Sequence, residues 1–156
     1  MIFQHTYKLV LEGRKTQTRR LVKPGECATL REWDRFVDEK HWTWSIVWTP
    51  DRRIKWQVGK TYAVQPGRGQ KAVGRIRITN IRREHVQDIS EADAIAEGMT
   101  DTYFDGLPSY KNRVIPGHLC RAAFADTWTT IHTKPGTRWE DDPEVWVLEF
   151  ELVRET

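Results

Sequence analysis

Apolar and polar side chains alternate near the end of the chain, and this pattern limits the folds available to it. Over residues 145–153, the apolar residues Trp146, Leu148, Phe150 and Leu152 occupy every second position. Successive side chains of a β-strand point to opposite faces of the sheet, so these four fall on one face. The segment is therefore predicted to be a strand with one buried face.

A tryptophan-rich segment earlier in the chain shows the same alternation. Trp42, Trp44 and Trp48, with an isoleucine between the last two, fall on one face of a predicted strand. A turn is predicted at residues 49–53, and a return strand at residues 54–58. We expect a hairpin with one aromatic face, which either packs in the core or stacks on the bases of a ligand.

Further short strands and helices are predicted along the chain. Gly13 and Gly98 suit the left-handed conformation that ends many helices, and Ser90 begins a sequence that resembles a capping box. Short strands combined with a few helices are typical of an α+β fold, and we expect a small β-barrel. The predicted helices cover residues 4–12, 92–97 and 119–130, the additional strands cover residues 61–65 and 72–81, residues 14–22 form an extended polar segment, and residues 101–117 form a loop.

The length and composition favour one folded domain that spans residues 1–156. Hydrophobic residues make up 38% of the chain, and eight tryptophans add apolar surface for a core. The net charge of +3 is too small to establish nucleic-acid binding by itself. Basic residues concentrate within residues 14–23 and 68–83, which fits either an anion-facing surface or solvated strand faces.

Several functional classes are disfavoured by the residues that the chain contains. Cys27 and Cys120 are far apart and match no spacing known for zinc or haem, so we expect neither a metal nor another cofactor. The five histidines show no spacing of a triad or a metal site and are interpreted as structural or surface residues. We find neither a secretion signal nor a run of about 18 apolar residues. We therefore expect a cytoplasmic protein with reduced thiols that does not associate with membranes.

Two short motifs resemble those of the ASCH domain family. Residues 13–20, Gly-Arg-Lys-Thr-Gln-Thr-Arg-Arg, resemble its Gly-x-Lys-x-x-(Thr/Ser)-x-Arg signature, and residues 89–99 resemble its second motif, an acidic helix that ends in Glu-Gly. The order of the other predicted elements is also similar, so the resemblance covers most of the chain. The tryptophan-rich hairpin and the loop at residues 101–117 look like insertions. The resemblance implies a PUA-like β-barrel with flanking short helices, a fold that elsewhere binds RNA.

The resemblance also implies an activity and a set of catalytic residues. Some bacterial members of the family are amidohydrolases that act on N(4)-acetylcytidine, and their catalytic residues correspond to Lys15, Thr18 and Glu97. Thr18 would then be the nucleophile and Lys15 the base that activates it. Glu97 would protonate the leaving amine or hold the cytosine edge. Lys15 and Thr18 are three residues apart, so the chain must bend for both side chains to face one site.

Other polar residues near the motifs are candidates for substrate binding, and each also has a structural interpretation. A helix C-terminus disfavours a carboxylate, so Glu97 needs a cationic partner or a function, and a structural salt bridge to Lys15 or Arg20 is the simpler alternative. Basic glycine-rich turns are common, so the loop near Arg68 need not touch a ligand. The predicted substrate-binding residues are Arg14, Arg20, Gln65, Arg68 and Lys71.

The sequence leaves other functions open beside the amidohydrolase. The same basic cleft would suit a module that binds RNA or a modified nucleotide, with arginines on phosphates and an aromatic side chain stacked on a base. A ribonuclease is a third possibility, ranked last because neither motif contains a histidine. The expected partner is a modified cytosine nucleoside or RNA.

Overall fold

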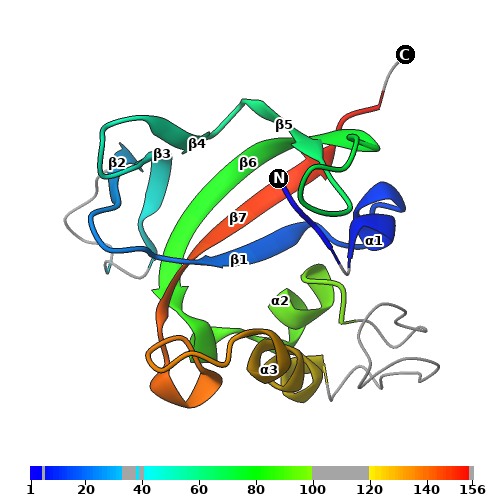
Figure 1. Ribbon diagram of the computed structural model, residues 1–156. Helices are drawn as coiled ribbons and strands as arrows, with labels where there is room; N and C mark the ends of the chain where they lie inside the picture. The colour runs from blue at the N-terminus through cyan, green and yellow to red at the C-terminus, as the bar shows by residue number, and fades with distance from the viewer. Residues whose placement is uncertain (5, 33–37, 39–40, 100–119, 155–156) are drawn as a thin grey trace.

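Two antiparallel β-sheets form the upper part of the molecule in the computed structural model, which describes residues 1–4, 6–32, 38, 41–99 and 120–154 (Figure 1). The larger sheet has the strand order β1-β7-β6-β5 and the smaller one β2-β3-β4. The strands are β1 (Gln17–Leu21), β2 (Cys27–Glu32), β3 (Thr43–Trp48), β4 (Ile54–Gln57), β5 (Thr61–Val64), β6 (Gly74–His85) and β7 (Glu144–Leu152).

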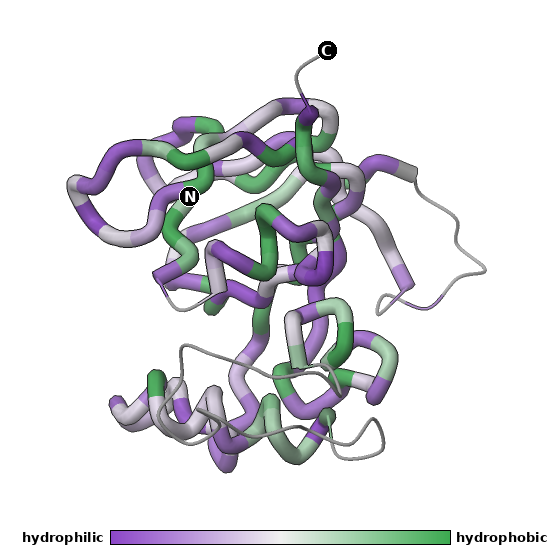
Figure 2. Tube along the Cα trace, turned by 90° about the vertical axis from the view of Figure 1, so that its right-hand side faces the viewer, coloured by the Kyte–Doolittle hydropathy of each residue, from purple (hydrophilic) through white to green (hydrophobic). Residues whose placement is uncertain are grey.

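Two of the helices, α2 and α3, lie below the sheets, and the view turned by 90° shows the same separation of layers (Figure 2). α2 and α3 pack against each other under the larger sheet, whereas α1 lies beside the N-terminus. None of the described helices is both long and apolar enough to cross a membrane. The helices are α1 (Tyr7–Leu11), α2 (Glu91–Ala96) and α3 (Cys120–Ile131), with single 3-10 turns η2 (Val86–Asp88) and η4 (Trp139–Asp141).

The central strand β7 was predicted correctly as a strand, but it is buried on both faces rather than one. Trp146 and Leu148 pack into the core between the two sheets. Val145 and Val147 point the other way and pack into a second core with α3. The alternation in the sequence identified the strand. The burial of its second face depends on helices that are distant from it in the sequence.

The tryptophan-rich segment folds as β3 and β4, which pair antiparallel, and β2 adds a third strand. The predicted aromatic face is wrong in detail, because Val47 is the fully buried residue of β3 while Trp48 is partly exposed. Trp44 still packs on the core between the sheets, with its ring edge-on to Trp146 at 6.4 Å between centroids. Register shifts on both sides of β3 break the strict alternation that the prediction assumed.

The described strands form two separate sheets, and they are not joined into one closed barrel. The strand predicted at residues 72–81 is longer than expected, because β6 continues to His85 and pairs with β7 over most of its length. Val73, inside the predicted range but before the first residue of β6, is 44% exposed. The loop predicted at residues 101–117 lies outside the described residues.

The predicted helix boundaries agree with the structure to within a few residues. Gly13 and Gly98 have φ angles of +74° and +108°, the left-handed conformation expected after α1 and α2. The Ser90 hydroxyl accepts a hydrogen bond of 3.0 Å from the backbone N–H of Asp93, so Ser90 caps α2. Ser90 thus caps the beginning of α2, and Glu97 is the C-cap residue at its other end.

The substitution Ile81→Ala tests the packing between the sheets. Ile81 lies opposite Leu148 and is fully buried, so its truncation leaves a cavity and should lower the free energy of unfolding by about 2–5 kcal/mol. Ile54 is 50% exposed and provides the control, since Ile54→Ala should change this free energy by less than about 0.5 kcal/mol. Urea denaturation measures both, and similar losses would contradict the assignment of Ile81 to the core.

Candidate functional site

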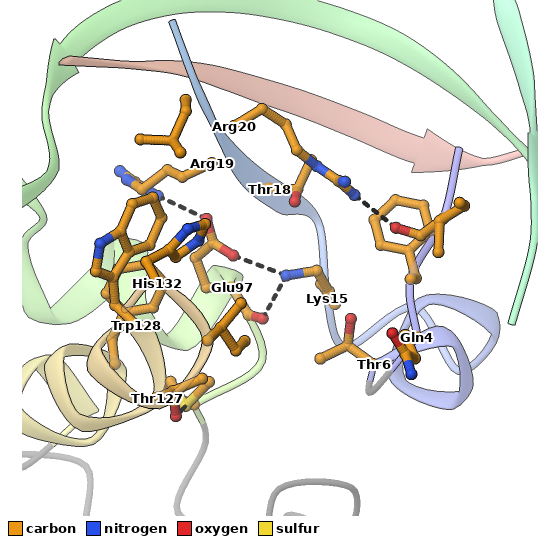
Figure 3. A pocket seen from close by; sticks show the side chains of 16 residues that line it. Gln4, Thr6, Lys15, Thr18, Arg19, Arg20, Glu97, Thr127, Trp128 and His132 are labelled. Atoms are coloured by element: carbon orange, nitrogen blue, oxygen red, sulfur yellow. Dashed lines mark hydrogen bonds and ion pairs between the residues drawn. The ribbon is translucent and has the colours of Figure 1, made fainter. Parts of the chain in front are cut away.

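A cavity of about 420 Å³ opens between β1, the C-terminal end of α2, α3 and the N-terminal segment (Figure 3). The residues of both sequence motifs contribute to its wall. Apolar side chains from α3 and the N-terminus complete it. The lining residues are Ile2, Phe3, Gln4, Thr6, Lys15, Thr18, Arg19, Arg20, Leu21, Glu97, Met99, Phe124, Thr127, Trp128, Ile131 and His132.

The chain bends between α1 and β1, which brings Lys15 and Thr18 to the same cavity. The backbone N–H of Lys15 donates to the carbonyl of Leu9 at 3.1 Å, which holds the segment after α1 against that helix. Thr16 then donates to the carbonyl of Ala96 at 2.8 Å, which ties the segment to α2. The regular strand begins only at Gln17, after Lys15. The side chains of Lys15 and Thr18 therefore do not have to point to opposite faces, as they would in one straight strand.

Lys15 and Glu97 form a buried ion pair at the floor of the cavity. The Lys15 ammonium donates to Glu97 Oε2 at 2.7 Å and to the backbone carbonyl of Glu97 at 2.8 Å, and only 5% of each side chain is exposed. Because Glu97 is the C-cap of α2, the ammonium also compensates the negative end of the helix. Burial lowers the pKa of Lys15 from its ordinary value, although the nearby Glu97 carboxylate opposes the shift.

Arg19 joins this pair to a wider ionic network. It donates to Glu97 Oε1 at 3.2 Å, to Glu84 Oε1 at 2.6 and 3.1 Å, and to Asp93 Oδ2 at 3.2 Å. Burial by itself lowers the pKa of Arg19, but the three carboxylates outweigh it and raise this pKa. The predicted salt bridge from Glu97 is therefore present with Lys15, while the arginine involved is Arg19 rather than Arg20.

Thr18 and Arg20 lie two residues apart on β1 and both line the cavity. Thr18 is buried, and its hydroxyl has no hydrogen-bond partner among the described residues. Arg20 Nη2 donates to the carbonyl of Ile2 at 2.7 Å, and its guanidinium carbon lies 5.3 Å from the centre of the Phe3 ring. The buried Nε atom of Arg20 has no partner in the described part of the chain.

The wall formed by α3 was not predicted as part of the site. Phe124 and Trp128 fall in the helix predicted at residues 119–130, to which no function was assigned, and His132 was interpreted as structural or surface. The His132 ring instead stacks on Trp128, with 3.9 Å between centroids, and lines the cavity. Burial lowers the pKa of His132, and the positive charge of Arg20 lowers it further. The available sequence signal was the spacing of four residues between Trp128 and His132, which directly follows α3 and donates its backbone N–H to the carbonyl of Trp128 at 2.8 Å.

Four of the predicted substrate-binding residues do not line this cavity. Arg14 is partly exposed and forms an ion pair with Glu12, just after the end of α1. Gln65 is joined to the N-terminal segment through its backbone, and its side chain donates to the carbonyl of Gln70 at 3.2 Å. Arg68 and Lys71 are exposed. A role of these four in ligand binding stays a prediction from sequence.

The chemistry available in the cavity comes from a lysine, a threonine hydroxyl, a carboxylate and two arginines. Across the residues described, no group of three or more His, Cys, Asp or Glu side chains is arranged to hold a metal ion. A hydroxyl and a lysine of lowered pKa that line the same cavity are a combination suited to nucleophilic attack. A polar floor under an aromatic wall is suited to binding a planar, polar ligand.

The substitution Glu97→Gln tests how far the fold depends on the buried network. It leaves Lys15 and Arg19 without their shared carboxylate, so the free energy of unfolding should fall by about 3–5 kcal/mol. Glu151 provides the control, because its pair with Arg77 is exposed and Glu151→Gln should change this free energy by less than about 1 kcal/mol. Chemical denaturation of both variants measures the difference. A Glu97→Gln variant as stable as the wild type would rule out a structural role for the network.

Comparisons with known proteins identify the fold. Neither a protein-family model nor a curated protein sequence matches the chain. One similar solved structure is protein EF3133 from Enterococcus faecalis V583, described under family model DUF984, with 17% identity and a TM-score of 0.52 over 94% of this chain. This chain spans 66% of that protein, just under two thirds of its length.

An ASCH domain from Lactobacillus crispatus JV V101 is a second match, with 16% identity and a TM-score of 0.48 over 94% of this chain and 69% of that one. The similarity to the Enterococcus protein establishes that the chain has its fold, a small β-sheet domain with few helices.

Proposed function

We propose that the protein is an amidohydrolase of the ASCH family that removes an acyl group from the exocyclic amine of N(4)-acylated cytosine nucleosides, such as N(4)-acetylcytidine. The observation that carries the proposal is the buried contact between Lys15 and Glu97. These residues belong to different motifs and lie 82 positions apart in the sequence, yet they meet at 2.7 Å in the wall of a cavity that Thr18 also lines (Figure 3).

Thr18 and Lys15 are assigned the first chemical step. The Thr18 hydroxyl attacks the acyl carbonyl while the neutral amine of Lys15 takes its proton. The bond between the carbonyl carbon and the exocyclic nitrogen then breaks, and the proton passes from Lys15 to that nitrogen. The products of this step are the free cytosine nucleoside and an acyl ester on Thr18. Water hydrolyses the ester with Lys15 again as the base, which releases the carboxylic acid and restores Thr18.

The environment of Lys15 supports its role as a base. A lysine with an ordinary pKa is almost fully protonated at neutral pH and holds no lone pair for a proton. Burial lowers this pKa, and the charges of Arg20 and Arg19 lower it further, although Glu97 opposes them. The Lys15 amine therefore reaches its neutral form at a lower pH than an exposed lysine does.

Glu97 is assigned the role of positioning Lys15. Its Oε2 atom accepts from Lys15 and its Oε1 atom accepts from Arg19, so both oxygens are already engaged by cations. A carboxylate held in this way orients the amine toward the cavity, and the proton for the leaving group comes from Lys15. This assignment differs from the acid role suggested by the family resemblance.

The size and wall of the cavity fit a nucleoside. Its volume of about 420 Å³ lies within the range of about 300–1,000 Å³ that is usual for small-molecule sites. Phe124, Trp128 and His132 supply an aromatic wall on the side of α3, and such a wall suits a flat base. A module that only binds RNA or a modified nucleotide would use the same cavity, and turnover distinguishes it from an enzyme.

Release of cytidine from N(4)-acetylcytidine tests the proposal. Wild type should release cytidine, and Lys15→Ala should lower kcat/KM by at least about 100-fold because the base is lost. Lys60→Ala should leave the rate unchanged, since Lys60 is exposed and does not line the cavity. Liquid chromatography follows the product, and thermal unfolding shows whether each variant folds. Equal rates for folded Lys15→Ala and wild type would remove the mechanism, and no release by wild type would favour the binding module.

The pH dependence of the reaction provides a second test. The neutral form of Lys15 is the active one, so kcat/KM should rise with pH as the ammonium loses its proton. Because burial lowers this pKa, the midpoint of the rise should fall below the ordinary value of about 10.4 for lysine. Rates measured across the neutral and alkaline range locate the midpoint. A midpoint at or above the ordinary value would contradict Lys15 as a base made available by burial.

A further inference from the structure

Arg20 differs from the other cations in the cavity wall. Lys15 pairs with Glu97, and Arg19 pairs with Glu84, Asp93 and Glu97. In the described part of the chain, Arg20 has no carboxylate within ion-pair distance. Three cationic side chains therefore line the cavity against one carboxylate, Glu97, which is already shared by the other two.

The contacts of Arg20 leave much of its binding capacity unused. Its only protein acceptor among the described residues is the carbonyl of Ile2, and the ring of Phe3 covers part of the guanidinium. The Nε atom is buried without a partner, and a buried donor without an acceptor is costly to stability. Nε is enclosed by the protein, whereas Nη1 donates to none of the described residues and belongs to a side chain that lines the cavity, so the guanidinium offers a ligand both a donor and a charge.

We propose that the Arg20 end of the cavity is an oxyanion subsite and that the ligand carries a phosphate or a carboxylate that pairs with the Arg20 guanidinium. A guanidinium binds either group through parallel N–H donors. If the ligand is an acylated cytosine nucleoside, the anion is either a phosphate on its ribose or a carboxylate at the far end of the acyl group. The choice of the nucleoside rests on the proposed function, whereas the preference for an anion rests on Arg20.

His132 provides an internal reporter for the charge at this subsite. It lines the same cavity, and the charge of Arg20 contributes to the low pKa of its ring. An anion bound at Arg20 would offset that charge, so the pKa of His132 should rise on binding. The other charged groups near His132 are Lys15, Arg19 and Glu97 in the cavity and Arg138 and Glu140 in the adjoining hollow beside η4.

Two pairs of probes separate the possible sources of the anion. Calorimetric titration of wild type with cytidine and with cytidine 5′-monophosphate tests a phosphate. Titration of the Thr18→Val variant, which lacks the nucleophile, with N(4)-acetylcytidine and with N(4)-succinylcytidine tests a carboxylate. In at least one pair, the anionic probe should bind about tenfold tighter or more than its neutral counterpart.

Substitution of Arg20 shows whether the preference originates there. Arg20→Gln keeps a donor for the carbonyl of Ile2 but removes the charge, so the preference for the anionic probe should disappear while binding of the neutral probe is kept. Arg83→Gln is the matched control. Arg83 also lies over an aromatic ring, that of Trp146, but it pairs with Glu144 and does not line the cavity. This control should keep the full preference.

The titration of His132 by NMR needs no substitution at Arg20, so it also decides the case in which Arg20→Gln fails to fold. Its pKa should rise when the preferred anionic probe is bound and stay unchanged with the neutral one. Equal affinity for anionic and neutral probes in both pairs, or an unaltered preference in Arg20→Gln, would overturn the subsite. A preference for the anion without any hydrolysis would support the subsite and remove the proposed enzyme, so the two proposals fail separately.

Discussion

The buried ion pair between Lys15 and Glu97 is the interaction on which the arrangement of the site depends. It joins the segment before β1 to the C-terminal end of α2, and Arg19 extends it to Glu84 on β6. Burying two charges is costly, and only good geometry with further hydrogen bonds offsets that cost. The backbone carbonyl of Glu97 and the Arg19 guanidinium supply those bonds. The network therefore holds the residues of the site in place. It also allows β1, a short strand with polar side chains, to be buried.

The two sheets and the helices provide a rigid frame around this network. β7 is central, since its opposite faces pack into the core between the sheets and the core beneath the helices. β1 pairs with β7 along its whole length, so Thr18 and Arg20 are held at fixed positions above the cavity. The cap at Ser90 fixes α2 from its other end. A lysine, a threonine hydroxyl and an arginine that has no carboxylate partner among the described residues thus line one cavity, on elements joined by hydrogen bonds.

The sequence predicted the regular elements well because their patterns are local. The alternation around Leu148 and the cap at Ser90 depend on neighbouring residues, and both were predicted correctly. The burial of β1 was missed, because a run that includes Arg19 appears solvated until its distant carboxylates are known. His132 was missed for a similar reason, since its place in the cavity depends on the packing of α3 rather than on any motif. Sequence patterns identified the elements, while the contacts between distant segments required the structure.

The proposal assigns a covalent role to one residue, and rapid quenching with N(4)-acetylcytidine followed by mass spectrometry of the Thr18 peptide tests that role most directly. The mechanism predicts that this peptide transiently carries an acetyl group in wild type, in step with the release of cytidine, and that the Thr18→Val variant shows neither. Because Lys15 is the base in both steps, Lys15→Ala should slow both the formation and the hydrolysis of the Thr18 ester. Cytidine release by wild type with no acetylation of Thr18 at any quench time, or by Thr18→Val at the wild-type rate, would contradict the account.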